Sequence, residues 1–158
     1  MSLKKELQEA LHDAIKAKDE TRKITLRMAL TSIRMAEDRK LTKLEEGEDR
    51  KNAELSDDEV LAVLQKEVKS RQETIADAQK AGRPEMIADA EAQIAILEEY
   101  LPKPLSQDEL EELARQSIEE AGAESPREMG QVMKILMPKL GGRATGQQAS
   151  QAVRKLLQ

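Results

Sequence analysis

Apolar residues recur every three or four positions along most of the chain, which is the period of an amphipathic α-helix. The stripe nearest the amino terminus comprises Leu3, Leu7, Leu11 and Ile15. Comparable stripes lie within residues 24–33, 60–75, 87–101, 110–118, 129–137 and 149–156. No segment alternates apolar and polar residues as a half-buried strand would. The pattern therefore predicts an all-α protein.

Capping signals divide these stripes into separate helices. Serine or threonine followed three residues later by Glu or Gln can form a capping box. Such boxes occur at residues 56–59, 106–109, 125–128 and 145–148. Gly82 suits the left-handed residue after a helix, and Pro84 suits the first turn of the next one. The helices on either side of Gly82 are therefore predicted to form a long antiparallel hairpin.

Two further segments interrupt the helical pattern. Residues 39–55 are highly polar and contain Gly47, so we expect a mobile connection there. Near the carboxyl terminus, Pro138 and the Gly141-Gly142 pair are expected to close the helix that follows Pro126.

The sequence Leu101-Pro102-Lys103-Pro104 must break the helical chain. Each proline lacks an amide hydrogen and restrains the preceding residue toward extended backbone. We therefore predict an N-terminal helical domain at 1–101, a linker at 102–105 and a small three-helix tail domain at 106–158.

The net charge of −5 hides a marked asymmetry. From Pro126 onward, six Lys or Arg residues accompany one acid, a net charge of +5, so residues 1–125 carry −10. The basic end suggests an anionic partner. The chain has one Tyr and no Phe or Trp, so base stacking on aromatic side chains is essentially excluded. Any contact with nucleic acid must rely on charge and shape.

The residues needed for common catalytic sites are missing. The chain has no cysteine and a single histidine, His12, and it lacks a P-loop, a dinucleotide-binding glycine motif and a GxSxG motif. We predict no catalytic residue, no metal site and no cofactor. There is also no apolar signal or membrane-spanning run, so we expect a cytoplasmic protein that does not engage a membrane.

The segment from Met137 to Gly146 is the best candidate binding site. Its glycines could let backbone amides approach an anion, and nearby Lys and Arg residues supply charge. The competing interpretation is a plain turn between two short helices. The predicted RNA-binding residues are Lys134, Lys139, Gly142, Arg143, Gly146 and Lys155.

Several short motifs resemble those of the GatB/YqeY family. In the tail they are Glu99-Tyr100-Leu101-Pro102, Gly122-Ala123, Met129-Gly130-Gln131-Val132-Met133, Leu136-Met137-Pro138 and Gly142-Arg143-Ala144-Thr145-Gly146. Earlier matches are Thr25-Leu26-Arg27, Leu64-Gln65-Lys66-Glu67 and Ala81-Gly82-Arg83. The resemblance spans nearly the whole chain and is that of a stand-alone YqeY-like protein.

The resemblance implies a tail domain like that of the B subunit of the Asp/Glu-tRNA amidotransferase, where the tail helps to hold tRNA. It implies tRNA as the partner, with no DNA expected, and Arg143 and Lys139 as contacts. The family commonly has an acidic residue where this chain has Thr145, which can still cap a helix.

Two other functions stay open. One is a protein-interaction module without RNA binding, docked on an amidotransferase or another translation-related protein. The other is the enzymatic activity that the family resemblance implies, that of a carbon-nitrogen ligase with glutamine as amido-N-donor. No autonomous catalytic site for that reaction is visible, because a cysteine nucleophile or a Ser/Lys amidase constellation is missing.

Overall fold

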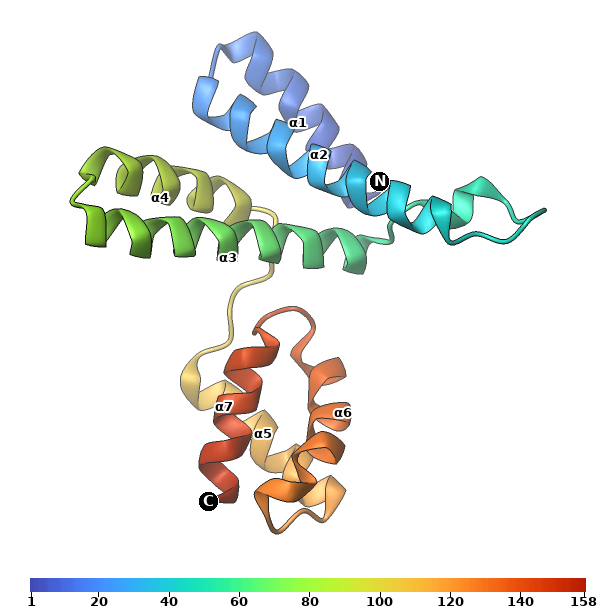
Figure 1. Ribbon diagram of the computed structural model, residues 1–158, viewed down its shortest axis with the longest axis vertical. Helices are drawn as coiled ribbons and strands as arrows, with labels where there is room; N and C mark the ends of the chain where they lie inside the picture. The colour runs from blue at the N-terminus through green and yellow to red at the C-terminus, as the bar shows by residue number, and fades with distance from the viewer. The chain divides into compact units, whose positions relative to one another are not determined.

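The computed structural model describes residues 1–158 and contains helices but no strand, which confirms the predicted all-α class (Figure 1). The chain divides into two compact units, Met1–Leu101 and Pro102–Gln158. The first unit contains α1 (Leu3–Ala17), α2 (Glu20–Thr42), the short 3₁₀ helix η1 (Arg50–Ala53), α3 (Asp57–Ala81) and α4 (Pro84–Glu98). The second contains α5 (Gln107–Ala121), the 3₁₀ turn η2 (Pro126–Glu128), α6 (Met129–Leu140) and α7 (Gly146–Leu157).

Capping boxes begin three of these helices where the sequence predicts them. At the start of α3, the Glu59 amide donates to Ser56 Oγ at 3.3 Å, and the Ser56 amide donates to Glu59 Oε2 at 2.8 Å. The same reciprocal bonds begin α5 and α7. At Ser125, the Glu128 carboxylate likewise accepts a hydrogen bond from the serine amide. The chain there makes a 3₁₀ turn before α6 begins. Local side-chain chemistry therefore sets most of the helix starts.

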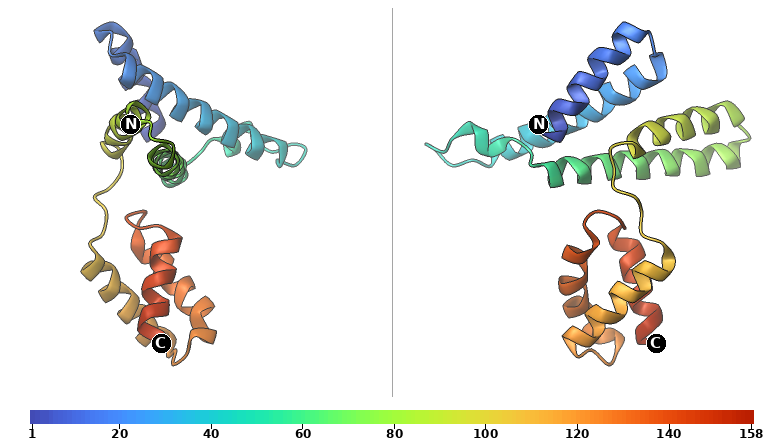
Figure 2. Two further views of the ribbon diagram at one scale, coloured as in Figure 1. Left: turned by 60° about the vertical axis from the view of Figure 1, so that its left-hand side comes forward. Right: turned by 180° about the vertical axis from the view of Figure 1, so that it is seen from behind.

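The N-terminal unit consists of two helical hairpins, α1 with α2 and α3 with α4 (Figure 2). Gly82 adopts a left-handed conformation at the turn of the second hairpin, as predicted. Leucine and isoleucine side chains from all four helices form the core of this unit. The fully buried ones are Leu7, Leu26, Ile33, Leu64 and Leu97.

The apolar stripes predicted for α1 and α2 are only partly buried. Ile15 and Ile24 are 44% and 47% exposed, although both follow the apolar period. Ile15 lies in the last turns of α1, while Ala14 beside it is buried. The period marks the apolar residues of a helix, but only the partner helices determine which of them become covered.

A polar network lies between α2, α3 and α4. Arg71 is only 6% exposed, and its Nη1 donates to Glu67 Oε2 at 2.8 Å. Its Nε donates to Gln93 Oε1 at 2.8 Å, and Ser32 Oγ donates to Glu67 Oε1 at 2.7 Å. Buried charges are tolerated when they are paired and hydrogen-bonded in this way. The network thus fixes the two hairpins of the unit to each other.

The polar segment after Arg39 is more ordered locally than the sequence suggests. Helix α2 continues through Thr42, and η1 covers Arg50–Ala53. Ala53 is buried, and the Leu55 amide donates to Glu37 Oε1 at 3.2 Å. These contacts hold the end of the segment against α2.

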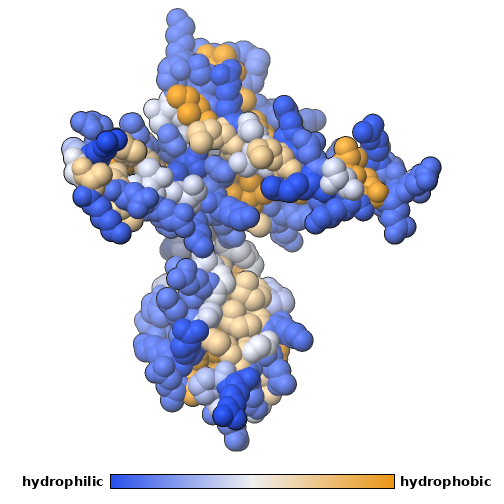
Figure 3. Space-filling view, in the orientation of Figure 1, coloured by the Kyte–Doolittle hydropathy of each residue, from blue (hydrophilic) through white to orange (hydrophobic).

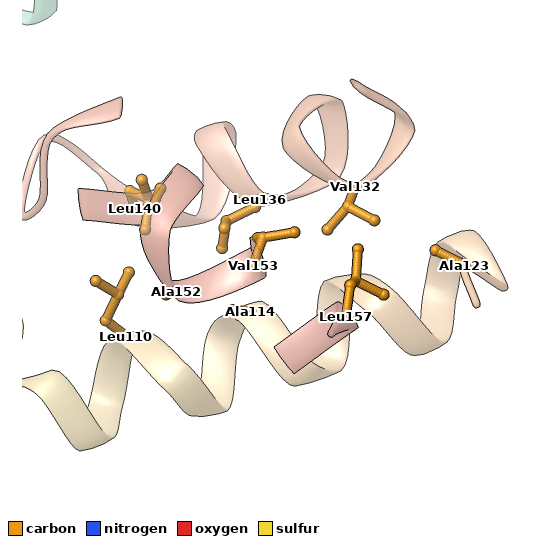
Figure 4. Packing of buried hydrophobic residues seen from close by; sticks show 10 residues of the cluster. Leu110, Ala114, Ala123, Val132, Leu136, Leu140, Ala152, Val153 and Leu157 are labelled. Carbon is orange, nitrogen blue, oxygen red and sulfur yellow. The ribbon is translucent and has the colours of Figure 1, made fainter. Parts of the chain in front are cut away.

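The C-terminal unit is a three-helix bundle. Side chains from α5, α6 and α7 point toward one another in its centre (Figure 4). The buried cluster is Leu110, Ala114, Ala123, Val132, Leu136, Leu140, Ala149, Ala152, Val153 and Leu157. Leu105, which we assigned to the linker, packs against this cluster. The end of the proline-containing segment is therefore part of the bundle.

Pro138 does not end α6, contrary to our expectation. The helix continues through Pro138 to Leu140 and ends at Gly141, which has a φ of 54°. Leu136 and Leu140 are both buried in the core. Proline removes one helical hydrogen bond near the end of the helix, and burial of Leu140 offsets that loss.

No α-helix of the chain meets the length and hydropathy that a membrane span requires.

Replacing Arg71 by alanine tests the buried network. We expect Arg71→Ala to lower the free energy of unfolding by about 3–5 kcal/mol, because Glu67 loses its partner between the helices. Lys23→Ala is the matched control, since it removes the pair of Lys23 with the 66% exposed Glu20 and should cost about 1 kcal/mol or less. Urea denaturation followed by circular dichroism measures both, and equal losses would contradict the structural role given to Arg71.

Candidate nucleic-acid interface

The turn between α6 and α7 contains the glycines that suggested an anion site. Gly141 and Gly142 have φ values of 54° and 74°, which few other residues adopt without strain. The Arg143 amide donates to the Leu140 carbonyl at 2.9 Å, which closes the end of α6. Thr145 then caps α7, whose first residue is Gly146. The turn geometry therefore accounts for glycine at 141 and 142 without a ligand.

Arg143 is directed toward the beginning of its own unit. Its Nε donates to the Lys103 carbonyl at 2.8 Å, and its own carbonyl accepts from the Leu105 amide at 2.9 Å. Its Nη2 lies 3.7 Å from Glu109 Oε2, and its side chain is 39% exposed. Arg143 thus fastens residues 103–105 to the bundle.

The surroundings of Arg143 are acidic. A shallow depression beside it is lined by Leu105, Asp108, Glu109, Glu112 and Leu113. The three carboxylates repel a phosphate group, and their repulsion outweighs the attraction by the one guanidinium. Arg143 is therefore a poorer phosphate ligand than its position in a glycine-rich turn suggests.

Lys139 and Lys155 also contact carboxylates of α5. Lys139 Nζ pairs with Glu120 Oε1, and Lys155 Nζ lies 2.9 Å from Glu111 Oε1. The Lys155 side chain is 69% exposed, so water and ions reach it freely. Exposed ion pairs of this kind contribute about 1 kcal/mol or less, and an incoming anion can compete for the lysine.

The exposed face of α6 carries a cation without a partner. Lys134 is exposed and its side chain makes no ion pair or hydrogen bond. It lies on the side of α6 opposite the buried Val132 and Leu136. Of the four predicted basic contacts, Lys134 alone is unpaired.

The short helix η2 and helix α7 each carry an unpaired cation that was not among the predicted site residues. Arg127 in η2 and Arg154 in α7 are exposed and make no side-chain ion pair or hydrogen bond. The sequence places both in the basic end, but it does not distinguish paired from unpaired cations. Only the fold does so, because α5 lies beside some of the basic residues and not others.

The charge of the whole unit differs from that of its basic end. Residues 102–158 contain eight Lys or Arg and eight Asp or Glu, so the unit is neutral overall. Most of the acids lie on α5, which packs against both α6 and α7. The +5 charge after Pro126 is therefore offset by a helix of the same unit, and only local clusters of charge remain.

The single histidine belongs to the N-terminal unit. His12 is exposed on α1, where it lines a shallow depression with Lys5, Gln8, Glu9 and Asp13. No group of three or more His, Asp or Glu side chains is arranged to hold a metal ion.

The comparison with protein families covers both units. Residues 4–157 match the model of the Yqey-like protein family. The chain belongs to that family. This confirms the resemblance seen in the short motifs, and the match shows that this YqeY-like chain retains the family pattern from α1 to α7. No curated protein matches the chain.

The Glu109 carboxylate at the start of α5 in this YqeY-like protein predicts a dependence of stability on pH. The Ser106 amide, which donates to the Glu109 carboxylate at 3.0 Å, lowers the pKa of Glu109 below 4.5, and the charge of Arg143 acts in the same direction. A carboxyl with a lowered pKa stabilises the folded state above its unfolded pKa. That stability is lost as the pH falls through the lower, folded pKa.

Glu109→Gln should therefore reduce the fall in stability below about pH 4.5, because glutamine keeps the cap but does not titrate. Urea midpoints measured between neutral and acidic pH provide the test. Glu119→Gln is the control, since the Glu119 side chain is exposed and makes no ion pair or hydrogen bond. A pH profile changed equally by both variants would contradict the assignment to Glu109.

Proposed function

We propose that the C-terminal unit binds tRNA and that the protein acts as an accessory factor in tRNA-related reactions. The observation that carries this proposal is a group of exposed cations in η2, α6 and α7 that make no side-chain ion pair or hydrogen bond, namely Arg127, Lys134 and Arg154. The family adds support, because YqeY-like proteins resemble the tail of the amidotransferase B subunit, which helps to hold tRNA.

Charge and shape would carry the recognition. Lys and Arg side chains neutralise phosphates and release the counterions around RNA, which makes the affinity fall steeply with salt. The single aromatic residue, Tyr100, lies in the other unit and is half-buried. Recognition would therefore depend on the backbone of a folded RNA, as is usual for double-stranded segments.

The unpaired and the paired cations should contribute differently. Lys134 and Arg154 can meet a phosphate without breaking an existing ion pair. Lys139 and Arg143 must first leave Glu120 and Glu109, and those carboxylates then stay close to the bound phosphate. The second pair should therefore contribute less to the affinity.

A tRNA titration with double variants tests the proposal. Lys134→Ala with Arg154→Ala should weaken binding and reduce the salt slope by about 2, roughly 1 for each lost phosphate contact. Lys139→Ala with Arg143→Ala should have a smaller effect. Lys69→Ala with Lys80→Ala removes the same charge from exposed, unpaired positions on α3 and serves as the control. No detectable tRNA binding by the wild type would refute the proposal. Equal, salt-insensitive binding by all the proteins would refute recognition of phosphates through these cations.

Protein interaction through the same unit is the second candidate function. Met129, Met133 and Met137 follow one another at four-residue spacing on α6, and Met137 is 42% exposed. Methionine side chains adapt to varied apolar partners. Copurification of a translation-related protein that persists after nuclease treatment, and is lost in Met137→Gln, would favour this function over RNA binding.

A further inference from the structure

Exposed apolar side chains are concentrated on one face of α2. Ile24, Met28 and Met35 are 47%, 48% and 54% exposed, respectively. With the exposed Thr31 they follow a spacing of four, three and four residues. This is the spacing of the contact positions in a helix that packs along another helix. The four residues fall within an arc of about 60°.

This face lies largely outside the core of the N-terminal unit, and it contacts the buried network through Met28 Sδ, which lies 3.7 Å from Arg71 Nη2. Leu26, Ala29 and Ile33, on the opposite side of α2, are fully buried. The other large apolar residues that are strongly exposed, Met1, Ile15, Met86 and Met137, come from separate segments. In Figure 3, apolar residues likewise interrupt an otherwise hydrophilic surface. A row of apolar residues on one helix is unusual for a surface that contacts only water.

One edge of the same face is cationic. Arg27 and Arg34 each precede a methionine of the row, and both are exposed. Neither makes an ion pair or a side-chain hydrogen bond. Residues 1–101 contain 18 Lys or Arg and 23 Asp or Glu, so these arginines stay unpaired although acids are plentiful in their unit.

The other edge of the face is already covered. Thr25 is buried, and Ser32 Oγ donates to Glu67 of α3. Asp38, the next position in the spacing, ends the apolar row. The free surface is therefore about three helical turns long, apolar along its centre and cationic along one edge.

We propose that this face of α2, Ile24, Met28, Thr31 and Met35 with Arg27 and Arg34, docks an amphipathic helix of another protein whose apolar stripe is flanked by carboxylates. The apolar row supplies the anchors of a helix-on-helix contact, and the methionines adapt to the partner's shape. Carboxylates on the partner pair with the two arginines and fix its register.

The charges argue against a second copy of this chain as the occupant. Antiparallel pairing of two α2 helices would place Arg27 of one copy near Arg34 of the other, which is repulsive. Parallel pairing would place Arg27 of one copy near Ser32 of the other and Arg34 near Arg39, so neither arginine would meet a carboxylate. RNA fits less well, because a phosphate backbone leaves three large apolar side chains uncovered.

Photo-crosslinking in the cells that make the protein tests this inference, which does not depend on tRNA binding. A benzophenone amino acid is incorporated in place of Thr31 in the full chain, and in a control in place of Gln8, exposed on α1. The crosslinked segment is then sequenced by mass spectrometry. We expect the Thr31 position to capture an amphipathic helix with acidic flanks, and the Gln8 position not to do so.

Charge reversal provides the matched variant. Arg27→Glu with Arg34→Glu should lower the yield of that crosslink by about tenfold or more, because carboxylates would then face carboxylates. Lys69→Glu with Lys80→Glu on α3 is the control and should leave the yield unchanged. Circular dichroism confirms that each variant is folded. No crosslink above the Gln8 background, a crosslink to a second copy or to RNA, or one insensitive to the arginines would overturn the inference.

Discussion

Pro102 and Pro104 impose the constraint on which the two units depend, because neither residue can donate a helical hydrogen bond. The chain therefore divides after Leu101, and each unit must close a core of its own. Without Phe or Trp, both cores consist mainly of Leu, Ile, Val and Ala. Small aliphatic cores leave much of the specificity to polar contacts, such as the Arg71 network and the ion pairs of α5.

The ion pairs of α5 determine which cations of the C-terminal unit are available to a partner. A count along the sequence finds a basic end, whereas the folded unit is neutral, with its basic helices packed against an acidic one. What a partner meets is therefore the small number of cations that α5 does not reach. Lys134 is a better candidate phosphate ligand than Arg143 because Lys134 has no ion-pair partner, whereas Arg143 lies beside Glu109. The net charge of the unit does not distinguish the two residues.

The features predicted correctly from the sequence are local ones. Capping boxes, the left-handed glycine at 82 and the helical period act over a few residues, so α3, α5 and α7 begin where expected. The features missed depend on contacts distant in the sequence. Leu140 keeps Pro138 inside α6 by packing in the core, and Ile24 stays exposed because no helix covers it. The partners of Lys139, Arg143 and Lys155 likewise come from another helix.

The contact between Arg143 and the Lys103 carbonyl has a consequence for sequence variation and for dissection of the protein. A backbone carbonyl is present whichever residue occupies position 103, so that position can vary while arginine at 143 is retained. The same contact means that the folded tail begins before its first helix. A fragment starting at α5 would lose the Leu105 packing and both bonds to Arg143, whereas one starting at Pro102 would keep them.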